Sequence, residues 1–191
     1  MRLLIMGPPG AGKGTQAMVV AEHLQIPAIS TGEIFRAQVK AGTPLGREVE
    51  RIVAGGDYVP DSITEQIVAQ RLAEPDAIRG WLLDGFPRTL HQVAALEQIL
   101  GEQRLDGVLS LEVDTDQLVA RMLRRAQIEG REDDTEDVIR HRMEVYTAAT
   151  EPLLQHYRGV GLLIGIDGDG GVDEVAARIR TSLNRLAASV R

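Results

Sequence analysis

The chain alternates between short apolar segments and longer segments in which apolar residues recur every three to four positions. Short apolar segments bounded by turn residues are typical of buried strands, and the longer pattern is typical of amphipathic helices. Strands that alternate with helices predict βαβ units, and so an α/β fold with a central, five-stranded parallel sheet flanked by helices. The predicted strands are Arg2–Met6, Pro27–Ile29, Trp81–Asp84, Gly107–Glu112 and Gly161–Ile166.

Two segments interrupt this alternation. Residues 31–61 contain two short helical patterns and no strand, and residues 127–134 form a polar insert between two long helical patterns. Long connections of this kind often have a function, such as binding a ligand or covering an active site. We therefore predict one domain with a core of residues 1–29, 62–125 and 135–191, one insertion at 30–61 and a second at 126–134. The predicted helices of the core are Lys13–Leu24, Ser62–Ala73, Thr89–Leu100, Thr115–Ala126, Glu136–Tyr157 and Val172–Ala188.

Composition narrows the function classes. The 191 residues suffice for one domain with a proper core, and 21 basic against 28 acidic residues give a net charge of −7, which disfavours nucleic acid as a partner. The absence of Cys excludes disulfides, thiolate catalysis and a cysteine-ligated zinc site, so we expect no zinc. No apolar stretch has membrane-spanning length, and the four histidines lack metal-ligand spacing. We expect a cytoplasmic protein without a membrane partner.

A glycine-rich motif follows the first predicted strand and opens the first predicted helix. Residues 7–13, GPPGAGK, fit the GxxxxGK pattern of a phosphate-binding P-loop. Glycines let backbone N–H groups approach phosphate oxygens, the helix N-terminus adds partial positive charge, and Lys13 can reach the β- and γ-phosphates. Gly14 stands where Ser or Thr usually offers a hydroxyl to Mg²⁺, and Thr15 comes one residue later. The sequence thus predicts the P-loop NTPase fold with Mg²⁺ held mainly by phosphates and water.

The third predicted strand ends at Asp84, where open α/β sheets bind ligands. We expect Asp84 to hold a water of the Mg²⁺ shell, and the alternative is a turn or helix-capping role before Gly85. A switch GTPase is disfavoured because the only Asn, Asn184, cannot form the Asn-Lys-x-Asp element that recognises guanine. Arginine suits bidentate phosphate recognition, although any one of these arginines could be solvated surface charge. Six arginines fall near predicted strand ends or the inserts: Arg36, Arg88, Arg121, Arg125, Arg131 and Arg142.

These motifs together resemble the adenylate kinase family, and the resemblance extends along the whole chain. Phe35 and Tyr58 stand where the family usually has an aliphatic residue, and the insertion at 126–134 resembles the short lid of one subgroup. The resemblance implies Mg²⁺-dependent phosphoryl transfer from ATP to AMP by a monomer. It rests on GPPGAGKGT (Gly7–Thr15), STGEIFR (Ser30–Arg36), YVPD (Tyr58–Asp61), LLDGFPRT (Leu82–Thr89), GREDD (Gly130–Asp134) and TEPL (Thr150–Leu153).

The resemblance also implies a role for individual residues. It assigns phosphoryl transfer to Lys13, Arg88, Arg125, Arg131 and Arg142. It assigns ATP binding to Gly10, Ala11, Gly12, Lys13, Gly14, Thr15, Arg121, Arg125 and Gly170. It assigns AMP binding to Thr31, Arg36, Asp57, Tyr58, Val59, Gly85, Phe86, Pro87, Arg88, Gln92, Arg131 and Arg142.

The chemistry of the residues agrees with these roles. An oxygen of the AMP phosphate is already anionic near neutral pH, so its attack needs no general base, whereas a hydroxyl acceptor would. The amide of Gln92 can pair with a donor and an acceptor on one adenine edge, which favours AMP over a pyrimidine nucleotide as acceptor. A catalytically silent nucleotide-binding regulator is the alternative from another class, and it would be expected to lack Lys13 or several of the arginines.

Overall fold

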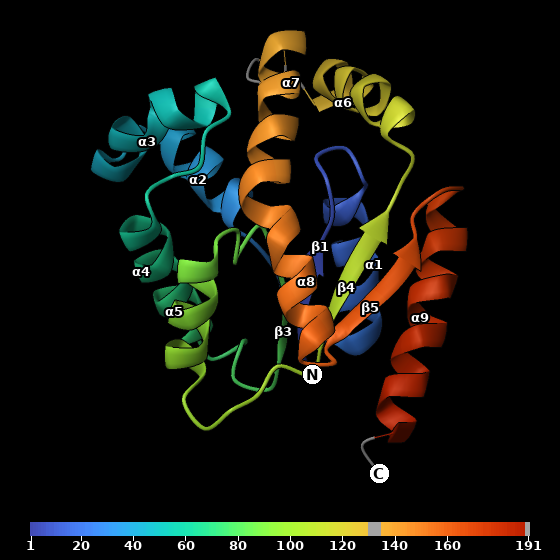
Figure 1. The fold of residues 1–191 in the computed structure, drawn as a ribbon. Coiled ribbons are helices and arrows are strands. Elements are labelled where there is room, and N and C mark those ends of the chain that lie inside the picture. Colours follow the sequence, from blue (N-terminus) through green and yellow to red (C-terminus); the bar gives the residue numbers. More distant parts are fainter. Residues whose placement is uncertain (130–134, 190–191) are drawn as a thin grey trace.

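Five strands form one parallel sheet in the computed structural model, which describes residues 1–129 and 135–189. Their order in the sheet is β2-β3-β1-β4-β5, and Leu4 in the central strand is in register with Leu83 on one side and Val108 on the other. All carboxyl ends therefore lie at one edge, which is at the top of Figure 1. The strands are β1 (Arg2–Met6), β2 (Ala28–Ser30), β3 (Trp81–Asp84), β4 (Gly107–Glu112) and β5 (Leu163–Asp167).

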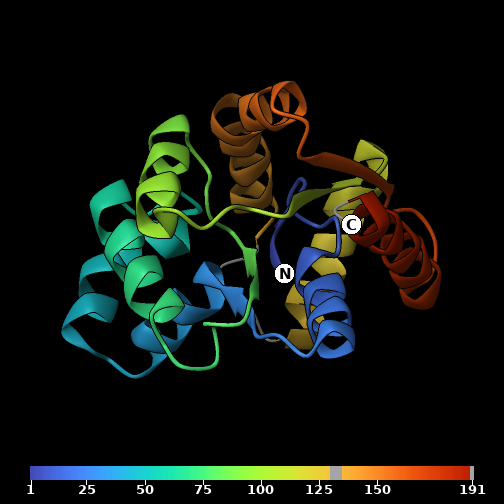
Figure 2. The same cartoon turned by 90° about the horizontal axis from the view of Figure 1, so that it is seen from below.

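Helices cover both faces of the sheet, as Figures 1 and 2 show. The pair α1 and α9 lies on one face and α4, α5 and α8 lie on the other. The helices are α1 (Lys13–Leu24), α2 (Thr31–Lys40), α3 (Pro44–Gly55), α4 (Asp61–Leu72), α5 (Leu90–Leu100), α6 (Thr115–Glu129), α7 (Glu136–Val145), α8 (Glu151–Gly159) and α9 (Val172–Ser189). A π-helical segment, η1 (Tyr146–Thr150), joins α7 to α8.

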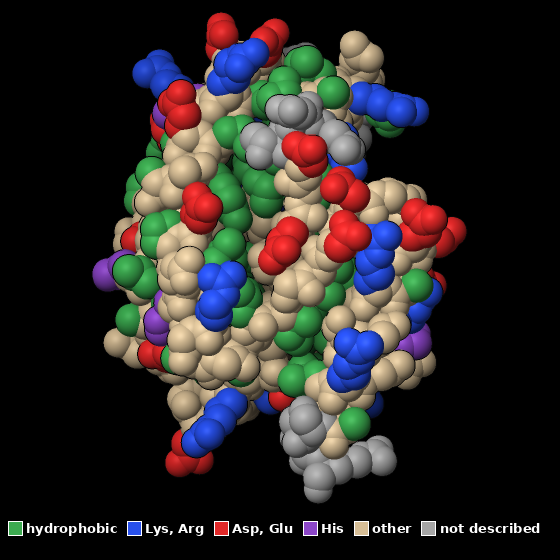
Figure 3. Space-filling model, turned by 45° about the vertical axis from the view of Figure 1, so that its right-hand side comes forward, with side chains coloured by type: hydrophobic (Ala, Val, Ile, Leu, Met, Phe, Trp, Pro, Cys, Tyr) green, Lys and Arg blue, Asp and Glu red, His purple; other side chains and the backbone are tan. Residues whose placement is uncertain are grey.

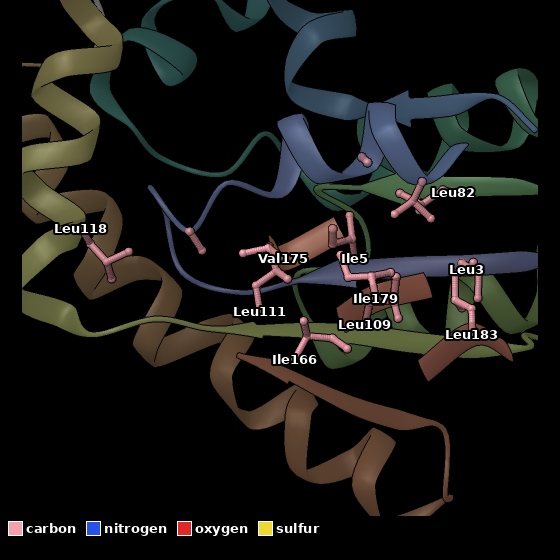
Figure 4. Packing of buried hydrophobic residues seen from close by; sticks show 13 residues of the cluster. Leu3, Ile5, Leu82, Leu109, Leu111, Leu118, Ile166, Val175, Ile179 and Leu183 are labelled. Atoms are coloured by element: carbon pink, nitrogen blue, oxygen red, sulfur yellow. The ribbon is translucent and has the colours of Figure 1, made fainter. Parts of the chain in front are cut away.

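The alternation of side chains along each strand separates two apolar clusters. In β1, Leu3 and Ile5 point into the cluster shared with α1 and α9, whereas Leu4 points into the cluster shared with α4, α5 and α8. Figure 4 shows Ile179 and Leu183 of α9 facing the strand side chains of the first cluster. Because both faces of β1 are covered, its residues 3–6 are all buried, which explains the uninterrupted apolar run in the sequence.

The segment that joins β2 to α4 forms a small unit with its own core. The side chains of Phe35, Val49 and Val59 make a third buried cluster between α2, α3 and the turn before α4. Ser30 and Thr43 cap the two helices by accepting hydrogen bonds from Glu33 N and Gly46 N. This unit stands beside the main sheet and forms one wall of a cleft.

The structure confirms the predicted fold class and parallel sheet, and it differs from several predicted bounds; strand β2, for example, is Ala28–Ser30 and not Pro27–Ile29. Helix α6 continues to Glu129, so residues 127–129 of the predicted polar insert are helical. Strand β5 begins at Leu163, two residues later than predicted. The predicted helix Glu136–Tyr157 contains a π-helical turn just before Pro152, which has no N–H to donate and whose ring crowds the preceding turn.

In the described part of the chain, no helix is long and apolar enough to cross a membrane. On the face shown in Figure 3, acidic side chains gather near the middle, and basic side chains are spread singly around them. This surface agrees with the net charge of −7.

Candidate functional site

A cleft of about 900 Å³ opens at the carboxyl ends of β1, β2 and β3. The loop between β1 and α1 forms its floor, the unit of α2 and α3 forms one wall, and α6 and α7 contribute to the other. Ligands of open α/β sheets bind at this edge. The cleft is therefore where the predicted site residues should meet.

The β1–α1 loop can only be built from glycine at the positions that approach other backbone. Gly7 has φ 143° and Gly10 has φ 83°, which are rarely adopted by other residues. A Cβ on Gly7 would lie 2.8 Å from the carbonyl oxygen of Leu111, and a Cβ on Gly10 would lie 2.8 Å from that of Leu118. The loop is thus pressed against β4 and α6, and its shape is set by backbone packing.

Lys13 stands at the start of α1 with its side chain folded over this loop. Its Nζ donates hydrogen bonds to the carbonyl oxygens of Gly7 and Pro8, both at 2.9 Å. The pKa of Lys13 is lowered to about 8, mainly by burial, with the Asp84 carboxylate opposing the shift and the positive charges of Arg88 and Arg125 adding to it. An anionic group in the cleft would offset this cost, because it favours the charged form of the amine.

The residues predicted to face ATP phosphates lie around Lys13, with one exception. Gly10, Gly12, Gly14 and Thr15 line the cleft, whereas the side chain of Ala11 is buried in the main core. Asp84 also lines the cleft, at the end of β3. A carboxylate that faces the P-loop fits Mg²⁺, which binds oxygen ligands and keeps several waters.

The opposite side of the cleft is organised around Arg88. Its Nε donates to the carbonyl oxygen of Gly85 at 2.8 Å, and its guanidinium lies 4.6 Å from the centre of the Tyr58 ring. Gly85 has φ 86°, and a Cβ there would lie 2.5 Å from Thr31 Oγ1 and 3.2 Å from Arg88. Glycine at position 85 therefore lets the start of α2, the end of β3 and the Arg88 side chain come together.

Gln92 lies next to Arg88 and is only 1% exposed. Its Oε1 accepts a hydrogen bond from Arg88 N at 2.7 Å, and its Nε2 donates to Asp61 Oδ1 at 2.6 Å. Gln92 nevertheless lines the cleft, and its Oε1 and Nε2 each have one further hydrogen-bonding position. The structure thus places this predicted base-binding residue beside the predicted phosphate-binding arginine.

Most of the other predicted residues also border the cleft. Thr31, Arg36, Asp57, Tyr58, Val59, Pro87, Arg121, Arg125 and Arg142 line it. Arg142 donates to Val53 O at 3.2 Å, which joins α7 to α3. Arg121 bonds to Asp169 Oδ1 at 3.3 Å, which brings α6 beside the loop that contains Gly170.

Besides Ala11, Phe86 and Gly170 are predicted site residues that do not line the cleft. The side chain of Phe86 is 2% exposed and belongs to the apolar core behind β3. Gly170 is exposed and lies outside the cleft lining, although its neighbour Asp169 bonds to Arg121. Arg131 lies outside the described residues. The cleft therefore contains most, but not all, of the predicted set.

Sequence reasoning missed several residues of the lining. Thr150 of η1 hydrogen-bonds to Tyr58 Oη at 2.7 Å and donates to Arg88 O at 3.1 Å, so it connects the π-helical turn to the Arg88 side. Tyr146 lines the cleft one helical turn earlier, and burial raises its pKa. The motif at Thr150–Leu153 could have pointed to Thr150, whereas Arg124 of α6 carried no signal beyond its neighbour Arg125.

The fold also assembles one group of acidic and histidine side chains that the sequence spacing did not suggest. Ligand atoms of Asp61, Glu65 and His91 all lie within 4.8 Å of one another. The side chain of His91 is 72% exposed.

Comparison with known proteins identifies the family. A sequence model described as adenylate kinase matches residues 5–162. An adenylate kinase of Nocardioides sp. is 56% identical over 186 residues, which cover 96% of this chain and 97% of that protein. The chain belongs to the adenylate kinase family. Adenylate kinases of Leifsonia xyli and Nocardia farcinica are 55% and 52% identical, over 95% and 97% of this chain and 92% and 100% of theirs.

Adenylate kinases transfer a phosphoryl group between Mg-ATP and AMP to give two ADP, and this chain has that activity by close homology. Both substrates of an adenylate kinase are polyanions, and this chain carries a net charge of −7. The cleft provides positive charge despite this net negative charge, because basic side chains gather there from five separate parts of the chain. They are Lys13 from α1, Arg36 from α2, Arg88 before α5, and Arg121, Arg124, Arg125 and Arg142 from α6 and α7.

Proposed function

We propose that this cleft holds ATP over the β1–α1 loop and AMP against residues 30–61, aligned for direct phosphoryl transfer between them. The observation that carries the proposal is that Lys13 and Arg88 meet in one cleft. They come from opposite sides of it, and Arg88 is close enough to lower the pKa of Lys13. Two such cations suit the triphosphate chain of ATP and the single phosphate of AMP, which approach each other end to end.

On the ATP side, the backbone supplies most of the binding. N–H groups of residues 10–15 at the start of α1 bind the phosphates, Lys13 bonds to the transferred group, and the adenine lies between Arg121 and the loop of Gly170. Asp84 holds Mg²⁺ through water. When bound, the ion offsets the charge that develops on the transferred group.

On the AMP side, side chains supply most of the binding. Arg36 and Arg88 bind the AMP phosphate, while Thr31, Gln92 and the segments 57–59 and 85–87 enclose the nucleoside. Gln92 bonds to the adenine. No general base is required, because the attacking phosphate oxygen is already anionic, so Arg125, Arg131 and Arg142 act by orienting and stabilising the transferred group.

The unit of residues 30–61 and the lid of residues 126–134 would close over the substrates, since a transfer between two phosphates must exclude water. A ligand that joins two adenosines through a polyphosphate should compact the protein more than ATP or AMP alone. The distance between labels at positions 55 and 128, which are both exposed, measures this. An unchanged distance in the doubly occupied protein would contradict closure.

A coupled assay of ADP formation tests the proposal most directly. ATP is paired in turn with AMP, GMP, CMP and UMP, with and without Mg²⁺, and the expected result is fast turnover with AMP only when Mg²⁺ is present. Gln92→Ala should raise the KM for AMP and narrow the gap between AMP and the pyrimidine acceptors. Faster turnover with UMP or CMP than with AMP would overturn the assignment of the acceptor.

One chain supplies both sides of the cleft, which supports a monomer as the working unit. We infer a monomer in the cytoplasm that binds neither nucleic acid nor zinc. Light scattering of the purified protein with both nucleotides measures its mass, and a dimer would contradict the inference.

A further inference from the structure

Asp61 lies at the junction between the unit of residues 30–61 and the main core. It is the first residue of α4, and its carboxylate reaches the start of α5. Asp61 Oδ1 accepts a hydrogen bond from Gln92 Nε2 at 2.6 Å, and Asp61 Oδ2 accepts one from Thr89 Oγ1 at 3.1 Å. Asp61 is not among the residues that line the cleft, so it acts on any substrate through Gln92.

The neighbours of Gln92 allow only one orientation of its amide. A carboxylate accepts hydrogen bonds and cannot donate them, so the Nε2 end must face Asp61. A backbone N–H only donates, so the Oε1 end must face Arg88 N, which lies 2.7 Å from it. A flipped amide would oppose acceptor to acceptor and donor to donor in a side chain that is 1% exposed, where unpaired polar groups are costly.

This fixed orientation has a consequence for base recognition. Each end of the amide retains one unused position, a lone pair on Oε1 and an N–H on Nε2, and their order along the amide is set. A 6-aminopurine presents an N–H donor at position 6 beside a ring-nitrogen acceptor. A 6-oxopurine presents an acceptor oxygen at position 6, with either an N–H donor at N1 or an acceptor at N7 beside it. For a base held in one pose, an amide that could flip would pair with positions 6 and 1 of either purine. A fixed amide pairs only with the 6-aminopurine, because the donor and the acceptor exchange places in the 6-oxopurine.

We propose that Asp61 is a specificity-determining positioning residue, which discriminates AMP from 6-oxopurine nucleotides by fixing the orientation of the Gln92 amide. The inference rests on the proposed contact between Gln92 and the base. It explains why the Gln92 amide, which could bind 6-aminopurines in one orientation and 6-oxopurines in the other, binds 6-aminopurines.

The test compares AMP with IMP, whose base differs from adenine at position 6 and in the proton on N1. In Asp61→Asn the new side chain can turn its own amide to accept from or donate to Gln92, so only Arg88 N still constrains the orientation. The ratio of kcat/KM for AMP to that for IMP should fall by about fivefold or more, through a higher KM for AMP, with kcat at saturating AMP within about twofold.

Glu65→Gln is the matched control. Glu65 lies on the same helix, one turn further along, and pairs at 2.8 Å with the exposed His91 and not with Gln92. This variant should retain the wild-type ratio. Asp61→Ser, whose hydroxyl both donates and accepts, repeats the test with a smaller side chain should Asp61→Asn unfold at the assay temperature.

Gln92→Ala tests the contact between Gln92 and the base separately from the role of Asp61. If Gln92→Ala lowers the ratio and both Asp61 variants leave it within twofold of wild type, the inference about Asp61 is overturned and the contact between Gln92 and the base stands. If Gln92→Ala leaves the ratio unchanged, both are overturned. A lowered ratio in Gln92→Ala and in the Asp61 variants, with Glu65→Gln unchanged, supports the proposal.

Discussion

The cleft has two sides that are held in place differently. The side of the β1–α1 loop is held by backbone packed against the main sheet and α6, whereas the side of Arg88 and Gln92 is held by hydrogen bonds of side chains. Gly7 and Gly10 abut the carbonyls of Leu111 and Leu118 with no space for a Cβ. Across the cleft, Arg88 is positioned by bonds of its side chain and backbone, and Gln92 is held between two hydrogen-bonding partners.

The two sides also rest on cores of different size. The β1–α1 loop is continuous with the large apolar cluster between the sheet, α1 and α9. The unit of residues 30–61 has a small core of Phe35, Val49 and Val59 with a few partly buried neighbours. Backbone packing gives a fixed site for a phosphate chain that is common to many nucleotides. A network of side chains on a small core can select a base and can move, so we expect changes on the first side to affect chemistry and changes on the second to affect affinity and selectivity.

The largest effect should come from Lys13→Met on the loop side. Removal of the ammonium group takes away a donor to the transferred phosphoryl group, so kcat should fall by roughly 10² to 10³-fold while the Kd for AMP stays within about twofold. Stopped assays of ADP formation and AMP titrations measure the two quantities.

Lys40→Met is the matched control, because Lys40 is the only other lysine of the chain and is exposed on α2. It should leave kcat unchanged. Retention of more than about a tenth of wild-type kcat in Lys13→Met would show that the loop side does not act on the transition state.

Arg88→Ala should have the next largest effect, on the other side of the cleft. Loss of the charge-assisted contact to the AMP phosphate should lower kcat/KM for AMP by roughly 10²-fold, with the Kd for ATP within about twofold. Arg140→Ala is the control, since Arg140 is an exposed arginine on α7 that pairs with Glu136 at 2.6 Å. Equal losses in AMP and ATP binding would show that the two sides are not separable.

A pH titration should give a smaller effect that is confined to the loop side. The pKa of Lys13 is lowered to about 8, below its ordinary value of 10.5, so the free protein loses this proton as the pH rises through 8. ATP favours the charged amine, so its binding takes up a proton there, and its Kd should rise by about fivefold from pH 8 to pH 9. Calorimetry in two buffers with different ionisation enthalpies measures the uptake.

Lys13→Arg is the control for this titration, because the guanidinium stays protonated throughout. Its Kd for ATP should be flat over the same interval. Folding has the opposite sign: between pH 8 and pH 10.5 the unfolded chain holds this proton and the free folded protein has released it, so the contribution of Lys13 to stability improves as the pH rises over this range. A pH-independent Kd for ATP in the wild-type protein would remove Lys13 from the phosphate site.

The smallest effect on catalysis should come from the small core. Val49 is fully buried among α2, α3 and the turn before α4, and Val49→Ala removes about two methylene equivalents, which costs about 2 kcal/mol of local stability. Hydrogen exchange of residues 31–60 should quicken and the KM for AMP should rise about twofold to threefold, with kcat unchanged. Leu109→Ala, in the large cluster, should instead lower the global unfolding free energy by about 2 to 5 kcal/mol. If the two variants gave identical hydrogen-exchange profiles, the two cores would not be separate.

Much of this molecule could be predicted from the order of its residues. The strand Trp81–Asp84 and the helix Lys13–Leu24 have the boundaries expected from periodicity, because both are short-range patterns closed by turn residues or glycine. The β1–α1 loop could be predicted for the same reason, since its chemistry lies in seven consecutive residues. The prediction was wrong in two places: the turn at Tyr146–Thr150, just before Pro152, is π-helical, and α6 runs on to Glu129.

What the sequence alone determined is therefore local: which segments are buried, where the phosphate-binding loop lies, and which arginines could bind phosphate. Only the tertiary structure decided how side chains far apart in sequence bond to one another. Asp61 meets Gln92 across 31 positions, and Tyr58 meets Thr150 across 92. Such partners have no sequence spacing that could predict them, because the packing of whole helices on the sheet sets the distance between them. The orientation of one buried amide, and with it the choice of base that we propose, belongs to this second class.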